Sequence, residues 1–136
     1  MKIVIDTNIV ISGVFFSGNP LKIVDAVADG KLHAFASAEI ISEYLDSTDK
    51  MIGRKQGYLK SYLLNKFISE VKVVEPKLSI NICRDPDDNK FLECAADVKA
   101  YYIVSGDKDL LTIQKYDDIE IVTAAEFCDM YPEIFS

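Results

Sequence analysis

The alternation of short apolar runs with longer stretches of helical periodicity most strongly constrains this fold. Strand-like runs occupy residues 2–5, 32–36, 71–74, 101–104 and 119–122. Amphipathic patterns with helical spacing separate most of these runs. Strands that alternate with helices favour a parallel sheet covered on both faces. We therefore expect a single α/β domain over residues 1–136, without internal repeats or linkers.

Acidic residues follow two of these predicted strands. Asp6 comes directly after the Ile/Val run of residues 2–5, and Asp107 follows residues 101–104 after Ser105 and Gly106. In open α/β sheets, ligands bind beyond the carboxyl ends of the strands. Alone, Asp6 is equally well explained as the start of a helix or turn. A functional role therefore depends on whether other carboxylates reach the same edge.

Two further acids fit that edge. Asp85 and Pro86 have the form of a helix cap and a first helical residue. At about 100° per residue, Asp88 then falls within the apolar face of the following helix. Glu43 lies just outside the apolar arc of a helix predicted over residues 37–47. A capping role alone is the alternative for Asp88. Residues 48–57 are expected to form a loop or a frayed helical end.

Carboxylates gathered at one edge require cations or shifted pKa values. Oxygen-only ligands, without clustered histidine or cysteine, indicate Mg²⁺ or Mn²⁺, as one or two ions. His33 is the only histidine, which excludes a paired-histidine ribonuclease. The sequence also lacks a Gly-x-Ser-x-Gly elbow and a phosphate-binding glycine loop. Acidic ligands, a metal ion and the lack of clustered histidine favour metal-assisted hydrolysis of a phosphodiester.

Composition limits the location and partners of the protein. The net charge of −7 argues against nucleic-acid binding through a broad basic surface. No apolar run approaches the roughly 20 residues of a membrane span, and no signal peptide is evident. The three cysteines, Cys83, Cys94 and Cys128, are expected to be free thiols in a reducing compartment. We therefore expect a cytoplasmic protein with no membrane contact.

Four stretches together resemble the PIN-domain ribonucleases, the family of VapC-type toxins in toxin–antitoxin modules. These stretches are residues 5–8 (IDTN), 37–43 (SAEIISE), 85–95 (DPDDNKFLECA) and 104–110 (VSGDKDL). Each is weakly specific alone, but their order and spacing are specific together. The resemblance covers the whole chain.

The resemblance implies a three-layer α/β/α fold with a central parallel sheet of about five strands in the order 3-2-1-4-5. It implies a metal-dependent endoribonuclease that hydrolyses single-stranded RNA, as the toxin of a toxin–antitoxin module. It also implies a homodimer, and an antitoxin whose tail covers the site.

By position, the resemblance assigns catalysis and metal binding to an acidic quartet of Asp6, Glu43, Asp88 and Asp107. Thr7, Asn8 and Ser105 would hydrogen-bond the carboxylates or metal-bound water. Asp109 is an auxiliary or an alternate to Asp107.

The acidic charge departs from the more basic surface of many relatives. RNA contact would therefore depend on the metal ions and on nearby cationic side chains. The candidates are Lys50, Arg54, Lys55, Lys60 and Lys108. For any single one of them, a position on a solvated face is the more common role.

Two other functions remain open at this point. A phosphotransferase of the haloacid dehalogenase type would use Asp6 as nucleophile and Ser37 as the hydroxyl after the second strand. That class usually carries a second aspartate where Asn8 stands. A catalytically silent module would use the acids to hold a structural ion or a basic partner.

Overall fold

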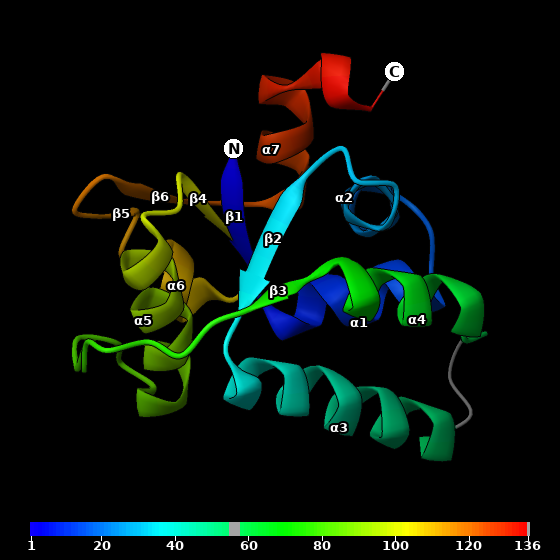
Figure 1. The fold of residues 1–136 in the computed structure, drawn as a ribbon, viewed down its shortest axis with the longest axis horizontal. Coiled ribbons are helices and arrows are strands. Elements are labelled where there is room, and N and C mark those ends of the chain that lie inside the picture. The colour runs from blue at the N-terminus through cyan, green and yellow to red at the C-terminus, as the bar shows by residue number, and fades with distance from the viewer. Residues whose placement is uncertain (55–57, 136) are drawn as a thin grey trace.

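The computed structural model describes residues 1–54 and 58–135 (Figure 1). Within these residues, strands form one sheet in the order β3-β2-β1-β4-β6-β5. Their bounds are β1 Lys2–Ile5, β2 His33–Ala36, β3 Lys72–Val73, β4 Tyr102–Val104, β5 Lys115–Tyr116 and β6 Ile119–Val122. The expected α/β fold and the order of the five expected strands are confirmed.

The expectation of a wholly parallel sheet was wrong at one edge. β5 pairs antiparallel with β6, whereas all the other pairs are parallel. A two-residue strand is too short to carry an alternation pattern, so it could not be predicted from periodicity. The turn between β5 and β6 contains Asp117 with a positive φ of 50°. Such a left-handed residue suits a tight reversal, and Asp adopts it more readily than most residues.

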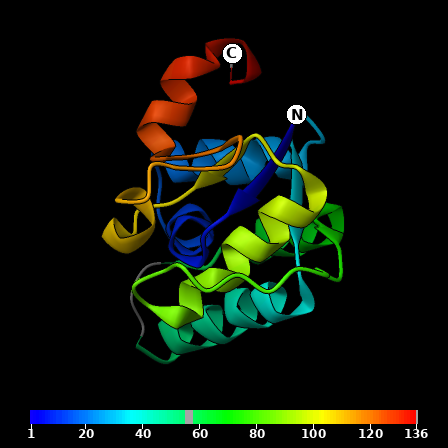
Figure 2. The ribbon, with the colours of Figure 1, turned by 90° about the vertical axis from the view of Figure 1, so that its left-hand side faces the viewer.

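Helices cover both faces of the sheet. They are α1 Thr7–Phe15, α2 Asn19–Ala28, α3 Ala38–Arg54, α4 Ser61–Glu70, α5 Asn89–Val98, α6 Lys108–Leu111 and α7 Ala124–Met130, with short 3₁₀ turns η1 Pro86–Asp88 and η2 Pro132–Ile134. Helix α5 contacts β1, β2 and β4 from one side, while α1, α2 and α4 pack together on the other (Figures 1 and 2). Helix α3 lies beyond the carboxyl ends of β1 and β2, at the bottom of Figure 1.

Helix α3 is longer than expected. It continues to Arg54, so the loop or frayed end predicted from residue 48 was wrong for the described part of that stretch. The Thr48 side chain is buried and donates a hydrogen bond of 2.8 Å to the Tyr44 carbonyl. Met51, one turn further along, packs against the core. The polar composition of this stretch therefore hides an inward-facing stripe.

The central strands fix the position of α3. Ile3, Val4 and Ile5 are fully buried, as expected for a parallel strand covered on both faces. The buried Tyr44 hydroxyl donates a hydrogen bond of 2.5 Å to the Ile5 carbonyl. This bond ties α3 to the end of β1, next to Asp6.

Side chains of α5 hold the irregular segment that leads from β3 into η1. The Asn89 Oδ1 atom accepts hydrogen bonds from the backbone N–H groups of Ile82 and Cys83, at 3.2 and 2.9 Å. Glu93 accepts another from the N–H of Ile80, at 2.9 Å. These bonds satisfy backbone groups that have no strand partner. They also fix the approach to Asp88.

No single helix within the described residues is long and apolar enough to cross a membrane. Helices α1 and α2 reach that length and composition only as a pair, which is bent by 93°.

The close contact between α1 and α2 depends on Gly13. A Cβ atom there would lie 2.6 Å from Val24 Cγ2 and 2.9 Å from the Pro20 carbonyl oxygen. Gly13→Ala is expected to lower the free energy of unfolding by about 1–3 kcal/mol, the usual cost of overpacking. Urea unfolding measures this change. Gly53→Ala in α3 is the control, because nothing lies within 4 Å of its added Cβ. An equal response of both variants would contradict the packing argument.

Candidate metal centre

Asp6 and Ser105 join the carboxyl ends of the two central strands. Asp6 follows β1 and Ser105 follows β4, and these strands pair in parallel. The Ser105 hydroxyl donates a hydrogen bond of 2.6 Å to Asp6 Oδ2, and the Asp6 N–H donates to the Val104 carbonyl at 2.9 Å. Both side chains are buried. The bond fixes the Asp6 carboxylate at the edge where the sequence predicts the site.

The same hydroxyl fixes a second acid. Ser105 Oγ accepts a hydrogen bond of 2.9 Å from the Asp107 N–H. Asp107 Oδ1 in turn accepts one of 2.9 Å from the Asp109 N–H and so caps the start of α6. A cap of this kind leaves the second carboxylate oxygen available. The loop after β4 therefore presents two neighbouring carboxylates.

Asp88 closes the cluster from the other side. Asp85 caps the 3₁₀ turn by accepting a hydrogen bond of 3.1 Å from the Asp87 N–H, and Asp88 ends that turn. The Asp88 side chain is 8% exposed, and its Oδ2 atom is buried without a hydrogen-bond partner among the described residues. Ligand atoms of Asp88, Asp107 and Asp109 lie within 4.8 Å of one another. We call these three residues the aspartate cluster.

Burial and mutual repulsion raise the pKa values of two acids. Burial, the neighbouring Asp107 carboxyl and the charge of Asp6 raise the pKa of Asp88 to about 7. Burial also raises the pKa of Asp6; the Ser105 hydrogen bond opposes this rise, whereas the charges of Asp107 and Glu43 add to it. The charges of Asp107 and Glu43 thus act on Asp6, and those of Asp107 and Asp6 act on Asp88. The charged forms of Asp6 and Asp88 are disfavoured without a compensating cation.

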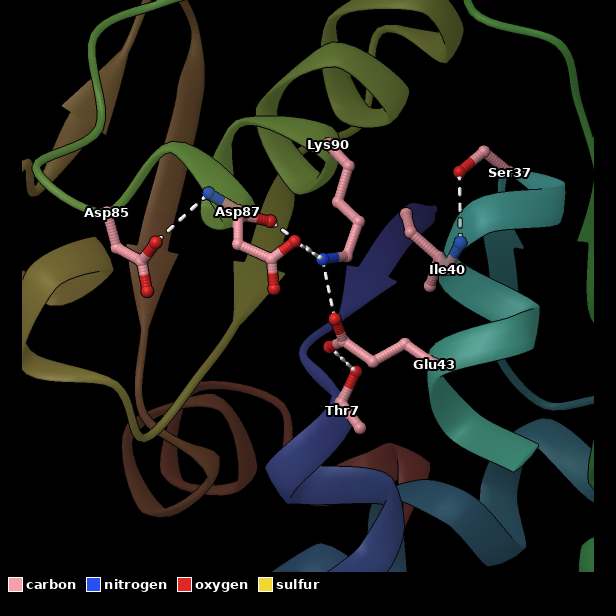
Figure 3. Close-up of polar contacts among 7 residues, drawn as sticks. All are labelled: Thr7, Ser37, Ile40, Glu43, Asp85, Asp87 and Lys90. Carbon is pink, nitrogen blue, oxygen red and sulfur yellow. Dashed lines mark hydrogen bonds and ion pairs between the residues drawn. The ribbon is translucent and has the colours of Figure 1, made fainter. Parts of the chain in front are cut away.

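Glu43 lies at the Thr7 side of the site. One oxygen of its carboxylate accepts a hydrogen bond from the Thr7 hydroxyl (Figure 3). The other lies 2.5 Å from the Lys90 ammonium. Lys90 also contacts the Asp87 carboxylate, at 3.1 Å, and the Asp87 carbonyl, at 2.7 Å. Glu43 is thus paired with a cation of the protein itself.

The sequence analysis did not identify Lys90. Its residue type suggests a solvated position, yet its side chain is 5% exposed. One signal was available: Lys90 precedes the fully buried Cys94 by one helical turn, so the two share a face of α5. A lysine on a buried face requires an acidic partner.

The other predicted contact residues lie outside this cluster. Asn8 is exposed, and within the described residues its side chain makes no hydrogen bond. Lys50 and Arg54 are exposed on the second half of α3, and Lys108 is exposed beside Asp107. Lys60 donates a hydrogen bond of 2.7 Å to the Phe16 carbonyl. Lys55 falls outside the described residues.

A surface hollow borders the aspartate cluster. It has a volume of about 230 Å³ and is lined by Ile82, Arg84, Asp109, Thr112 and Ile113. Arg84 is exposed there and was not predicted as a site residue. The hollow thus combines a guanidinium group with two apolar side chains next to the carboxylates.

A three-layer α/β fold with carboxylates gathered beyond its central strands defines a class of metal-dependent nucleases. The chain belongs to the PIN-domain family, whose model matches residues 2–109. It is 33% identical over 150 residues to an uncharacterized protein of Methanocaldococcus jannaschii, and the match covers 100% of this chain and 95% of that protein. No solved structure matches significantly. The family favours a nuclease over the phosphotransferase considered above.

The raised pKa of Asp88 predicts a pH dependence of stability without metal. Between pH 4 and 7 the folded protein keeps the Asp88 proton that the unfolded chain loses, so this residue's contribution to stability falls as pH rises. We subtract the free energy of unfolding of Asp88→Asn from that of the wild type. This difference is expected to fall as pH rises across that range, by up to about 1.4 kcal/mol per pH unit. Urea unfolding in EDTA measures it. A difference independent of pH would contradict the assignment.

Proposed function

We propose that this protein is a metal-dependent endoribonuclease that hydrolyses phosphodiester bonds in single-stranded RNA, as the toxin of a toxin–antitoxin module. The observation that carries the proposal is the buried Oδ2 atom of Asp88 in the aspartate cluster, which has no hydrogen-bond partner in the described part of the chain. A buried carboxylate oxygen without a donor is costly unless a cation or proton satisfies it. The family of metal-dependent nucleases supports the same interpretation.

The residues present fit a divalent ion. All the donors are carboxylate oxygens, which favour hard ions such as Mg²⁺ or Mn²⁺. Asp6 and the aspartate cluster would hold the ion, with Glu43 beside them. When bound, the ion would activate a water molecule for attack on phosphorus and stabilise the charge that develops on the phosphate.

The protein's own groups prepare this site. Ser105 holds Asp6 through Oδ2 and leaves Oδ1 available as a ligand. The same hydroxyl fixes the Asp107 backbone, so one side chain sets the relative position of two acids. A raised pKa lets Asp88 hold a proton until a cation displaces it. These bonds orient the carboxylates before any substrate arrives.

The hollow beside Asp109 supports RNA as the substrate. Arg84 is suited to pair with a phosphate, and Ile82 and Ile113 to contact the face of a base. An unpaired strand offers such a face, whereas a duplex hides it. Lys108, exposed beside Asp107, is a further candidate for phosphate contact. Local cations of this kind would offset the acidic charge of the chain.

Exposed apolar side chains support a protein partner. Ile52, Tyr58 and Tyr62 are 49, 82 and 80% exposed, in α3, before α4 and in α4 respectively. Large apolar side chains that are exposed in one chain are candidates for contact with another. We propose that an antitoxin and a second copy of the protein are its partners. The free cysteines favour a reducing compartment, the cytoplasm.

Asp6→Asn tests the proposed activity. We expect the wild type to cleave single-stranded RNA with Mg²⁺ or Mn²⁺, and Asp6→Asn to cleave it more than about a hundredfold slower, beyond the usual loss for groups that only support a ligand. Labelled single-stranded and duplex RNA on denaturing gels provide the measurement. Asp25→Asn, at an exposed position of α2, is the control. Equal cleavage by wild type and Asp6→Asn would refute the assignment. Mn²⁺ binding without cleavage would favour a silent binding module.

The toxin role predicts an effect on growth. Induced expression of the wild type is expected to arrest a bacterial culture, while Asp6→Asn at equal abundance is not. Colony counts after induction measure the effect, and co-expression of the adjacent gene is expected to restore growth. Normal growth with abundant, active wild-type protein would separate the nuclease from any toxin role.

A further inference from the structure

Lys90 is a buried cation among the acids of this site. Its side chain is 5% exposed, and its ammonium group has three N–H donors. It contacts three oxygen atoms: Glu43 Oε2 at 2.5 Å, the Asp87 carbonyl at 2.7 Å and Asp87 Oδ1 at 3.1 Å. The donors are therefore fully used. Figure 3 shows Lys90 reaching from α5 between these two acids.

Both oxygens of the Glu43 carboxylate have partners within the protein. Its Oε1 atom accepts from Thr7, and its Oε2 atom pairs with Lys90. Within the described residues, neither Glu43 nor Asp6 belongs to the group of acids whose ligand atoms lie within 4.8 Å of one another, and of these two only Glu43 pairs with a lysine. Glu43 is therefore both neutralised and set apart from the aspartate cluster.

The negative charge of the site is thus compensated unevenly. On the Glu43 side, Lys90 supplies a positive charge at hydrogen-bonding distance. On the other side, the buried Asp88 Oδ2 has no partner among the residues described. An external cation is needed only where the protein supplies none.

We propose that Lys90 is a positioning residue that neutralises Glu43 in place of a second metal ion. The centre then holds one divalent ion, on the side of the aspartate cluster. This inference rests on the proposed metal-dependent function and decides between the one and two ions that the acids alone permit.

Two physical effects keep a second ion away from Glu43. The ammonium already pairs with one oxygen of the Glu43 carboxylate, and its charge repels a divalent cation at short range. Asp87 holds Lys90 from the other side, so the ammonium cannot turn towards solvent without losing two contacts.

Lys90→Met tests the proposal through metal stoichiometry, without RNA. Met has a similar length but no charge, so Glu43 becomes free to bind an ion. Free Mn²⁺ is measured by electron paramagnetic resonance during titration of the metal-free protein. We expect one bound Mn²⁺ per wild-type chain and two per Lys90→Met chain, and a return to one in Lys90→Met/Glu43→Gln. Lys66→Met is the control, because Lys66 forms an exposed ion pair with Asp29; it should bind one.

Two bound ions in the wild type, or one in a folded Lys90→Met, would overturn the proposal. One bound ion in a folded Lys90→Met would mean that the Lys90–Glu43 ion pair only stabilises the fold. If the wild type binds no Mn²⁺, the proposed metal-dependent function itself is overturned. If circular dichroism shows that Lys90→Met is unfolded, Glu43→Gln carries the test. It is expected to weaken Mn²⁺ binding by less than about tenfold, below the range for groups that orient a ligand. A greater loss would make Glu43 a ligand and overturn the inference.

Discussion

The hydrogen bond from Ser105 to Asp6 joins the two strands on which the whole site depends. β1 and β4 are neighbours in the centre of the sheet, and each ends at this bond. Ser105 also accepts the Asp107 N–H, so the loop after β4 cannot shift without moving Asp6. The bond is buried, where a hydrogen bond to a carboxylate is stronger than at the surface. The geometry of the acids follows from the pairing of two apolar strands.

Repulsion among the carboxylates is the cost of this geometry, and the protein offsets it unevenly. Two neighbouring elements supply an acid and a base to the site. The short turn η1 ends at Asp88, and the first turn of α5, which follows directly, carries Lys90. The positive charge of Lys90 offsets the negative charge of Glu43. Asp88 has no such partner in the described structure, and burial together with the neighbouring Asp107 raises its pKa. A lysine that pairs with one of these acids reduces the positive charge that external cations would have to supply.

Support for the site extends into irregular backbone. The segment before η1 forms no strand in the described structure, and Asn89 and Glu93 of α5 hold it by bonds to its N–H groups. The same helix therefore carries Lys90, follows Asp88 and anchors the chain that leads to both. This makes α5 the scaffold of one half of the site, as β1 and β4 are of the other.

The sequence by itself determined the α/β class, the acids at the strand ends and the family, because these depend on local periodicity and on motifs of fixed spacing. It predicted Asp88 on an inward face from helical geometry alone. It did not predict β5, the full length of α3 or the burial of Lys90. The burial of Lys90 depends on a contact between segments far apart in the chain, its pairing with Glu43. Only the tertiary structure decided which acids are already neutralised, because charge compensation is a property of distances and not of residue order.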